Sequence, residues 1–198
     1  MVAVNPTTAD ADAELIQSSW DDADRFAALY DRHAARLYRY AYQRVGPQMA
    51  EDVVAETFLA AFQQRRSYDL ARPDARPWLF GILTNKLARH LRAEKAQYRA
   101  LTKAAQAGPV DGPADAVAAR VTAAGARAAL AAALARLSAG DRDVLLLVAW
   151  GDLSYEEVAT ALRIPLGTVR SRLHRARRKM RDALGGTNPI DDYLEEHQ

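Results

Sequence analysis

Cysteine is absent from the 198 residues of the chain. Without a thiol, the chain cannot form a disulfide framework, a thiolate nucleophile, a Cys-ligated zinc site or a thiol redox switch. Long hydrophobic runs are absent as well, because stretches such as residues 144–150 fall far short of the roughly 18 to 20 residues of a membrane span. The N-terminus also lacks the basic start and apolar block of a signal peptide. We therefore expect a soluble, cytoplasmic protein without membrane insertion.

Basic residues are absent from both ends of the chain. Residues 1–24 hold six acids and no base, and residues 186–198 hold four acids and no base. The whole chain has 27 Lys and Arg against 25 Asp and Glu, so removing those ten acids leaves 15 acids against 27 bases, a central net charge of +12. Such asymmetry indicates an anionic partner, with nucleic acid as the first choice and a membrane surface as the second.

Apolar residues recur at helical spacing in three segments of the first half of the chain. The segments are residues 26–45, about 49–66 and about 78–98. Residues 67–77, between the second and third segments, carry two prolines and predict a structured loop. We expect these helices to form a compact domain over about residues 20–100.

The composition changes after this first domain. Residues 101–125 are rich in Ala, Gly and Pro and predict a flexible linker. A second helical domain is expected over residues 126–184, where Ser138 and Ser154 are each followed three residues later by an acid, an N-cap arrangement. The predicted fold is therefore all-α, with two small helical domains between an acidic tail at residues 1–19 and another at 185–198.

The most informative motif spans residues 153–180. Its spacing predicts a helix of about eight residues, a short break and a second helix from about Thr168, which is the pattern of a helix-turn-helix. One apolar stripe should face the domain core, since its members are separated by four, three, four and four residues. These members are Val169, Leu173, Ala176, Met180 and Leu184. The other faces carry seven bases, and no acid occurs between residues 158 and 181.

A run of charge is most often a solvated helix face. Here no acid on a neighbouring turn neutralises the bases, so phosphates are the more natural counter-charge. The candidates for groove contact are Arg170, Ser171, His174 and Arg175, and Thr168 is short enough to reach phosphates or bases. The candidates for phosphate contact are Arg172, Arg177, Arg178 and Lys179. The four histidines are scattered along the sequence and predict no metal site.

Several motifs resemble the extracytoplasmic-function (ECF) group of bacterial RNA polymerase sigma factors. They are LSYEEVA at 153–159, GTVRSR at 167–172, HRAR at 174–177, AEDVVAETF at 50–58 and WLFGILTN at 78–85. The resemblance implies that the second domain reads the −35 promoter element, with Arg142 on the DNA backbone. It also implies that the helix with Asp52, Ala55 and Glu56 docks on the clamp helices of the largest polymerase subunit. Many relatives carry Gln where this chain has Ala55.

Without the resemblance, the residues themselves do not decide the role of the acidic pair on that helix. Asp52 and Glu56 are like charges at i and i+4, which suits a basic partner surface, but solvation or pairing with a nearby Arg explains them equally well.

A second basic stripe follows the WLFGILTN motif at steps of three and four residues. It comprises Lys86, Arg89, Arg92, Lys95 and Arg99. With Tyr68, Arg72 and Arg76 in the preceding loop, it fits single-stranded DNA, where cations follow phosphates and an aromatic or a pocket holds an unstacked base. The resemblance assigns this surface and Asn85 to the −10 element, and it implies that loop 67–77 holds a flipped base. Arg89 stands where many relatives carry Asp.

Together these features predict a sigma factor that binds core RNA polymerase and promoter DNA and helps to melt the −10 region, with an anti-sigma factor as a further partner. The chain shows no nucleophile with a plausible base, no phosphate-binding Gly loop and no metal cluster, so we expect no enzymatic activity and no cofactor. The main alternative is a stand-alone regulator that binds one operator through residues 153–181. A more distant one is an interaction protein whose basic stripes bind RNA or an acidic partner.

Overall fold

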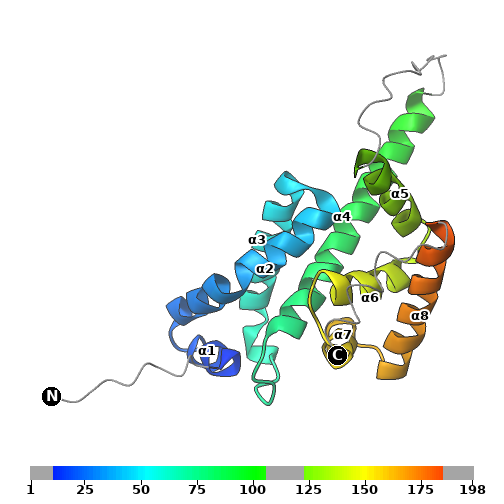
Figure 1. The fold of residues 1–198 in the computed structure, drawn as a ribbon. Coiled ribbons are helices and arrows are strands. Elements are labelled where there is room, and N and C mark those ends of the chain that lie inside the picture. The colour runs from blue at the N-terminus through cyan, green and yellow to red at the C-terminus, as the bar shows by residue number, and fades with distance from the viewer. Residues whose placement is uncertain (1–10, 106–122, 185–198) are drawn as a thin grey trace.

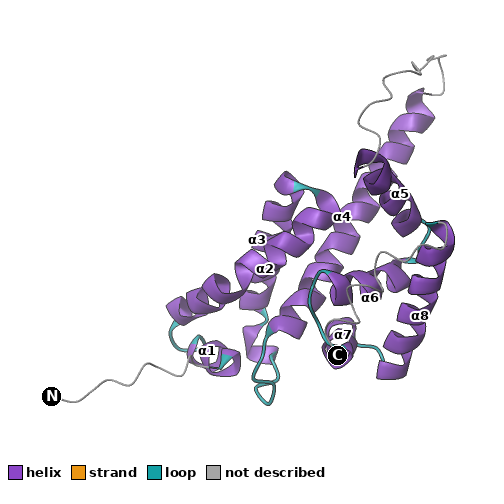
Figure 2. Cartoon of the chain, viewed as in Figure 1, coloured by secondary structure: helices purple, strands orange, loops and turns teal. Residues whose placement is uncertain are grey.

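A computed structural model describes residues 11–105 and 123–184 of the chain (Figure 1). Every regular element within these ranges is a helix, so the all-α expectation is confirmed (Figure 2). Within the same ranges, no helix combines the length and the apolar character that crossing a membrane requires. The predicted C-terminal tail, the first ten residues and the centre of the predicted linker lie outside the described residues.

Three long helices form the first domain, where the spacing of apolar residues predicted them. They are α2 (Ala27–Val45), α3 (Pro47–Gln63) and α4 (Arg76–Ala105). Gly46 separates α2 from α3 with a φ of 81°, which lies in the left-handed region that favours glycine. Pro47 then opens α3, at a position where its missing N–H costs no hydrogen bond. α4 continues five residues past the predicted end of the domain at residue 100.

The core of this domain positions α4 against the other two helices. Large side chains with no exposed surface come from each helix, among them Leu37, Tyr40, Val53, Phe80 and Leu83. The Tyr40 and Phe80 rings meet edge to face, with centroids 5.2 Å apart. Since burying one such side chain stabilises the fold by about 1.5 to 3 kcal/mol, α4 is held firmly along its first half.

A short helix, α1 (Asp12–Ser18), precedes the predicted helices and corrects the assignment of residues 1–19 to an acidic tail. Leu15 and Ile16 are buried, and Ile16 has no exposed surface. Asp12 lies in the first turn, where a carboxylate favours the helix N-terminus, and it is itself buried. The count of acids in this segment did not reveal the apolar face that packs it into the first domain.

Four helices form the second domain, and the helix-turn-helix among them is confirmed. They are α5 (Ala123–Ala135), α6 (Ala139–Ala149), α7 (Tyr155–Leu162) and α8 (Leu166–Ala183). The chain turns between α7 and α8 at Arg163, whose φ of 54° is left-handed. α8 thus begins two residues earlier than the sequence predicted, and α5 begins three residues earlier.

Both predicted N-caps are present in this domain. The Ser138 hydroxyl accepts a hydrogen bond from the Asp141 N–H at 3.2 Å, and the Ser154 hydroxyl accepts one from the Glu157 N–H at 3.2 Å. The Glu157 carboxylate accepts the Ser154 N–H in return at 2.7 Å, which completes a capping box. These caps set where α6 and α7 begin.

The two domains pack against each other (Figure 1). α4 contacts α2 and α3 within the first domain and α7 of the second domain. Gly81 on α4 lies against the backbone of Ala161 on α7, and a Cβ atom added at Gly81 would lie only 2.5 Å from the Ala161 carbonyl oxygen. An ion pair of 2.8 Å joins Arg44 on α2 to Asp143 on α6, and both side chains are largely buried. The structure is therefore a closed arrangement of the two domains.

Candidate nucleic-acid and polymerase interfaces

The exposed face of α8 carries the first group of predicted DNA contacts. Val169, Leu173, Ala176 and Met180 are buried, as the stripe predicted. Because this stripe fixes the rotation of α8, Arg170, His174 and Arg178 point to solvent along one line at steps of four residues, and Ser171 is exposed beside them. Thr168 is half-buried at the start of the helix. This face offers cations and hydrogen-bond donors to a DNA groove.

Arg175 has a protein partner that its exposure does not reveal. Its Nε donates to both carboxylate oxygens of Asp141 at 3.1 Å, and Nη2 lies 3.1 Å from Oδ1. The Asp141 side chain is only 4% exposed, and Lys179 approaches it at 3.8 Å. Arg175 therefore ties α8 to the start of α6, a role that sequence spacing could not separate from base contact.

Arg142 on α6 and Arg172 and Arg177 on α8 are half-buried. The guanidinium of Arg172 lies over Gly140, since a Cβ added at Gly140 would be 2.7 Å from Nη1. The Nε atoms of Arg142 and Arg177 are buried without a hydrogen-bond partner among the described residues. Arginine side chains of this kind are typical phosphate contacts.

The loop at residues 68–75 leads into α4 and carries the second group of predictions. Tyr68 is buried, its hydroxyl donates to the carbonyl oxygens of Arg72 at 2.7 Å and Asp74 at 3.1 Å, and its ring packs on Trp78. Burial and nearby carboxylates raise the pKa of Tyr68 well above its ordinary value, so the hydroxyl stays protonated as a donor. Tyr68 thus shapes the loop from within and is not presented for stacking on a base.

A pocket of about 520 Å³ lies between this loop, α4 and α7, and it brings most of the predicted −10 residues together. The predicted residues that line it are Tyr68, Arg72, Asn85, Lys86 and Arg89. Two predicted cations bind α7 across this interface: Arg72 Nη1 donates to the Thr160 hydroxyl at 2.9 Å, and Arg76 forms an ion pair with Glu157. The closed arrangement therefore engages cations that the sequence assigned to DNA.

Glu56 pairs with two basic side chains of α4, although its own side chain is 40% exposed. Lys86 Nζ lies 3.1 Å from its Oε2, and His90 Nε2 lies 3.1 Å from its Oε1. Partial burial alone would raise the pKa of Glu56, but hydrogen bonds and charge from Lys86 and His90 outweigh it and lower the pKa below its ordinary value. Asp52 and Arg92 are exposed, and the Arg92 Nε donates back to the Ala88 carbonyl oxygen at 3.0 Å. Of the acidic pair, Asp52 is therefore the more exposed, and the Glu56 carboxylate is already engaged by α4.

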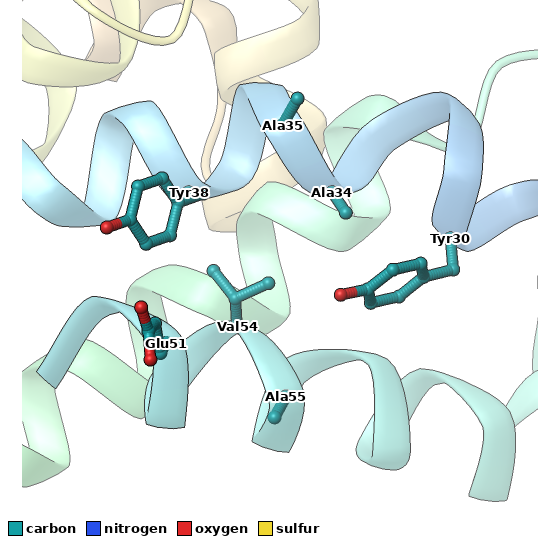
Figure 3. A pocket seen from close by; sticks show the side chains of 7 residues that line it. All are labelled: Tyr30, Ala34, Ala35, Tyr38, Glu51, Val54 and Ala55. Carbon is teal, nitrogen blue, oxygen red and sulfur yellow. The ribbon is translucent and has the colours of Figure 1, made fainter. Parts of the chain in front are cut away.

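A groove of about 540 Å³ runs between α2 and α3 (Figure 3). Tyr30 and Tyr38 line it from α2, and Glu51, Val54 and Ala55 line it from α3. Tyr30 is 48% exposed, although its ring also packs on a buried phenylalanine. Ala55 was predicted from the sequence, but the two tyrosines were not, and Tyr30 lies at the helical spacing of core residues.

Comparison with known proteins decides between the alternatives. Residues 29–97 match the family "Sigma-70 region 2", and residues 127–180 match "Sigma-70, region 4". The chain is 41% identical over 163 residues to the ECF RNA polymerase sigma factor SigL of Mycobacterium tuberculosis, covering 81% of this chain and 89% of SigL. The chain belongs to the ECF RNA polymerase sigma factors. It therefore serves promoter-specific transcription initiation, and the operator-binding alternative is not favoured.

Further relatives agree with this membership. The sigma factor is 29% identical to SigW of Bacillus subtilis, over 82% of this chain and 90% of SigW. Among solved structures, CnrH in complex with the cytosolic domain of CnrY superposes with a TM-score of 0.61 at 29% identity, covering 89% of this chain and 98% of CnrH. In this sigma factor, region 2 begins within α2 and region 4 within α5, so α1 precedes both matched regions.

Proposed function

We propose that this sigma factor contacts the −35 element through α8 and the −10 element through loop 68–75 and the first half of α4. The observation that carries the proposal is the rotation of α8, which buries the Val169 stripe and leaves Arg170, His174 and Arg178 exposed on one line. A recognition helix reads base edges from one exposed face, and arginine is the side chain best suited to guanine. The protein acts by binding alone, in the cytoplasm where the chromosome lies.

The proposed −35 contacts fall into two groups, side chains that read base edges and side chains that bind phosphates. Arg170, Ser171 and His174 lie near the start of α8, the end that enters the major groove in a helix-turn-helix. Arg142 on α6 and Arg172, whose guanidinium lies over Gly140 of α6, are assigned to phosphates, where their charge adds affinity without reading sequence. Thr168 and Arg178 flank the face at either end.

The −10 contacts require the two domains to separate. In the closed arrangement the Glu157 carboxylate holds Arg76 and the Thr160 hydroxyl holds Arg72. A DNA phosphate offers these cations the same oxygen chemistry, so promoter DNA competes with α7 for them. Asn85 and Arg89 are exposed beside the pocket, and opening widens access to it, so an unstacked base of the −10 strand is placed there.

Polymerase docking is assigned to the groove between α2 and α3. Exposed aromatic rings beside a groove are typical anchors of a protein interface. Tyr30 and Ala55 supply apolar surface there, and Asp52 supplies an exposed negative charge for a basic partner. Glu56 contributes indirectly, by holding α3 to α4 through Lys86 and His90.

An anti-sigma factor is proposed as a further partner. CnrH, which is similar in fold and sequence over almost the whole chain, was solved in complex with the cytosolic domain of CnrY. By this likeness, we expect a partner that holds the two domains closed and keeps the DNA surfaces covered.

The test is transcription by a reconstituted holoenzyme on promoters selected from a random library. The wild-type protein should select a −35 and a −10 element, and Arg170→Ala should relax the preference at the −35 element alone. Failure of folded protein to bind core polymerase, or tight specific binding to a duplex without polymerase, would contradict the proposal and favour the operator-binding alternative.

A further inference from the structure

The short helix α1 precedes the matched region 2, yet it makes specific contacts with the −10 loop. Asp12, at the start of α1, is 4% exposed. Its Oδ2 accepts the Ala75 N–H at 2.8 Å, where the loop ends and α4 begins. The same carboxylate is held by His33 at 2.7 Å and by Arg32, both on α2. One buried carboxylate thus joins α1, α2 and the end of the loop.

The end of α1 holds the other side of the loop. Arg65 Nε donates to the Ser19 carbonyl oxygen at 3.1 Å, and Arg66 Nη2 donates to the Trp20 carbonyl oxygen at 3.2 Å. Both arginines belong to a short 3₁₀ helix at Arg65–Ser67, which leads directly into the loop. The segment from α1 to Trp20 therefore contacts the entry and the exit of a loop that has no regular secondary structure.

Inside the loop, the hydrogen bonds join residues only a few positions apart, and Arg72 and Arg76 also pair with the nearby Asp69 and Asp74. The Tyr68 hydroxyl donates to the carbonyl oxygens of Arg72 and Asp74, and the Asp69 carboxylate accepts the Ala71 N–H at 3.1 Å. Such short-range bonds shape the turns, and contacts with the rest of the domain help to offset the entropy of ordering the loop as a whole. α1 and the two residues after it supply such contacts at both ends of the loop.

A cation site is the competing explanation for the buried cluster. Ligand atoms of Asp12, His33 and Asp74 lie within 4.8 Å of one another. The Asp12 oxygens, however, already accept hydrogen bonds from Arg32, from His33 and from a backbone N–H, and an arginine beside the carboxylate opposes a second cation. The donors around Asp12 fit a positioning role.

We infer that α1 is a positioning element for −10 recognition, in which Asp12 and the Ser19 and Trp20 carbonyl groups hold loop 68–75 in the shape that receives an unstacked base. This inference rests on the proposed −10 role of the loop. Asp12 is a positioning residue, since it acts through the loop and does not touch DNA.

The experiment compares holoenzymes that carry wild-type protein, Asp12→Asn, Arg65→Met or the control Asp21→Asn. Asparagine keeps the size of Asp12 but removes the charge that satisfies its donors, and methionine keeps the alkyl packing of Arg65 but removes its donor. Asp21→Asn removes the same charge from an exposed neighbouring position. The readouts are base preference in binding a single-stranded −10 oligonucleotide and amide hydrogen exchange over residues 68–75.

We expect Asp12→Asn to weaken the −10 base preference about tenfold, the loss expected when a hydrogen bond to a charged group is removed. Arg65→Met should act in the same direction, and both variants should raise exchange in the loop. Affinities for core polymerase and for −35 duplex should stay unchanged, as they should in Asp21→Asn.

Two outcomes overturn the inference: unchanged −10 preference in a folded Asp12→Asn variant, or equal losses in −35 and polymerase binding, which indicate a general folding role. Absence of any −10 base preference in the wild-type holoenzyme instead contradicts the proposed function of the loop.

Discussion

Replacing Gly81 by alanine should drive the two domains apart. The added Cβ atom would lie 2.5 Å from the carbonyl oxygen and 3.3 Å from the carbonyl carbon of Ala161. Both are backbone atoms in α7, so they cannot move aside as the end of a flexible side chain could. The clash is relieved only if α7, and with it the second domain, shifts away from α4.

Two effects of opposite sign determine how the Gly81→Ala substitution changes the free energy of the closed state. Alanine in a helix interior is about 1 kcal/mol more favourable than glycine, so α4 itself should gain stability. Overpacking at a tight contact costs about 1 to 3 kcal/mol, and here that cost applies only while the domains are closed. The closed state should therefore lose about 5-fold to 150-fold in population relative to the open state, while the helix content is kept.

Energy transfer between two dyes measures this change. The chain has no cysteine, so cysteines introduced at the exposed positions Gln63 and Asp182 carry the labels without competing thiols. Gly167→Ala is the matched control, since nothing lies within 4 Å of a Cβ atom at that position. Lower transfer in Gly81→Ala alone is expected, and equal transfer in Gly81→Ala and wild type would refute the reasoning about the contact.

Three further predictions concern single side chains. Arg170→Ala should reduce the discrimination between −35 sequences in holoenzyme binding by about 1 to 3 kcal/mol, and the melting temperature should stay unchanged. Arg175→Ala should instead lower the free energy of unfolding in urea by about 1 to 3 kcal/mol, because Asp141 loses its main partner. If the two variants melt alike, the Arg175–Asp141 pair contributes nothing measurable. Burial alone would raise the pKa of Asp12, but its hydrogen bonds from His33 and Ala75 outweigh this and lower the pKa below its ordinary value. Asp12 should therefore stabilise the fold above about pH 4, and this contribution should be lost as the pH falls through the folded-state pKa. Urea unfolding between pH 7 and pH 3 should show a smaller loss of stability in Asp12→Asn than in wild type, and equal slopes would argue against a folded-state shift. Finally, Asp52→Lys should weaken binding to core polymerase in a pull-down without changing the melting temperature, and unaltered polymerase affinity in this variant would move the docking surface elsewhere. Glu56→Lys should instead lower the melting temperature, because it removes the acceptor of Lys86 and His90 and places a like charge beside Lys86.

Local sequence signals predicted most of the helices. The caps at Ser138 and Ser154, the stop at Gly46 and the stripe through Val169 all depend on residues within a few positions of one another, and each is present. α1 was missed because its acids dominated a count of charge, while its apolar face covers less than two turns.

The candidate site was less predictable, because a charged side chain reveals its partner only in three dimensions. Arg170 and Arg175 look alike in the sequence, yet Arg170 is exposed to solvent and Arg175 holds Asp141, 34 residues away. Glu56 likewise pairs with Lys86 and His90 from another helix, which spacing along α3 could not indicate.

The sequence by itself determined the all-α fold, the helix-turn-helix, the excess of positive charge and the family resemblance, since each of these is written in short-range patterns of residue type. Only the tertiary structure decided which cations are exposed, that α1 contacts loop 68–75, and that α7 lies against Gly81. These depend on contacts between residues distant in the chain, such as Asp12 with Ala75. Such contacts exist only once the helices have packed and excluded water from between them.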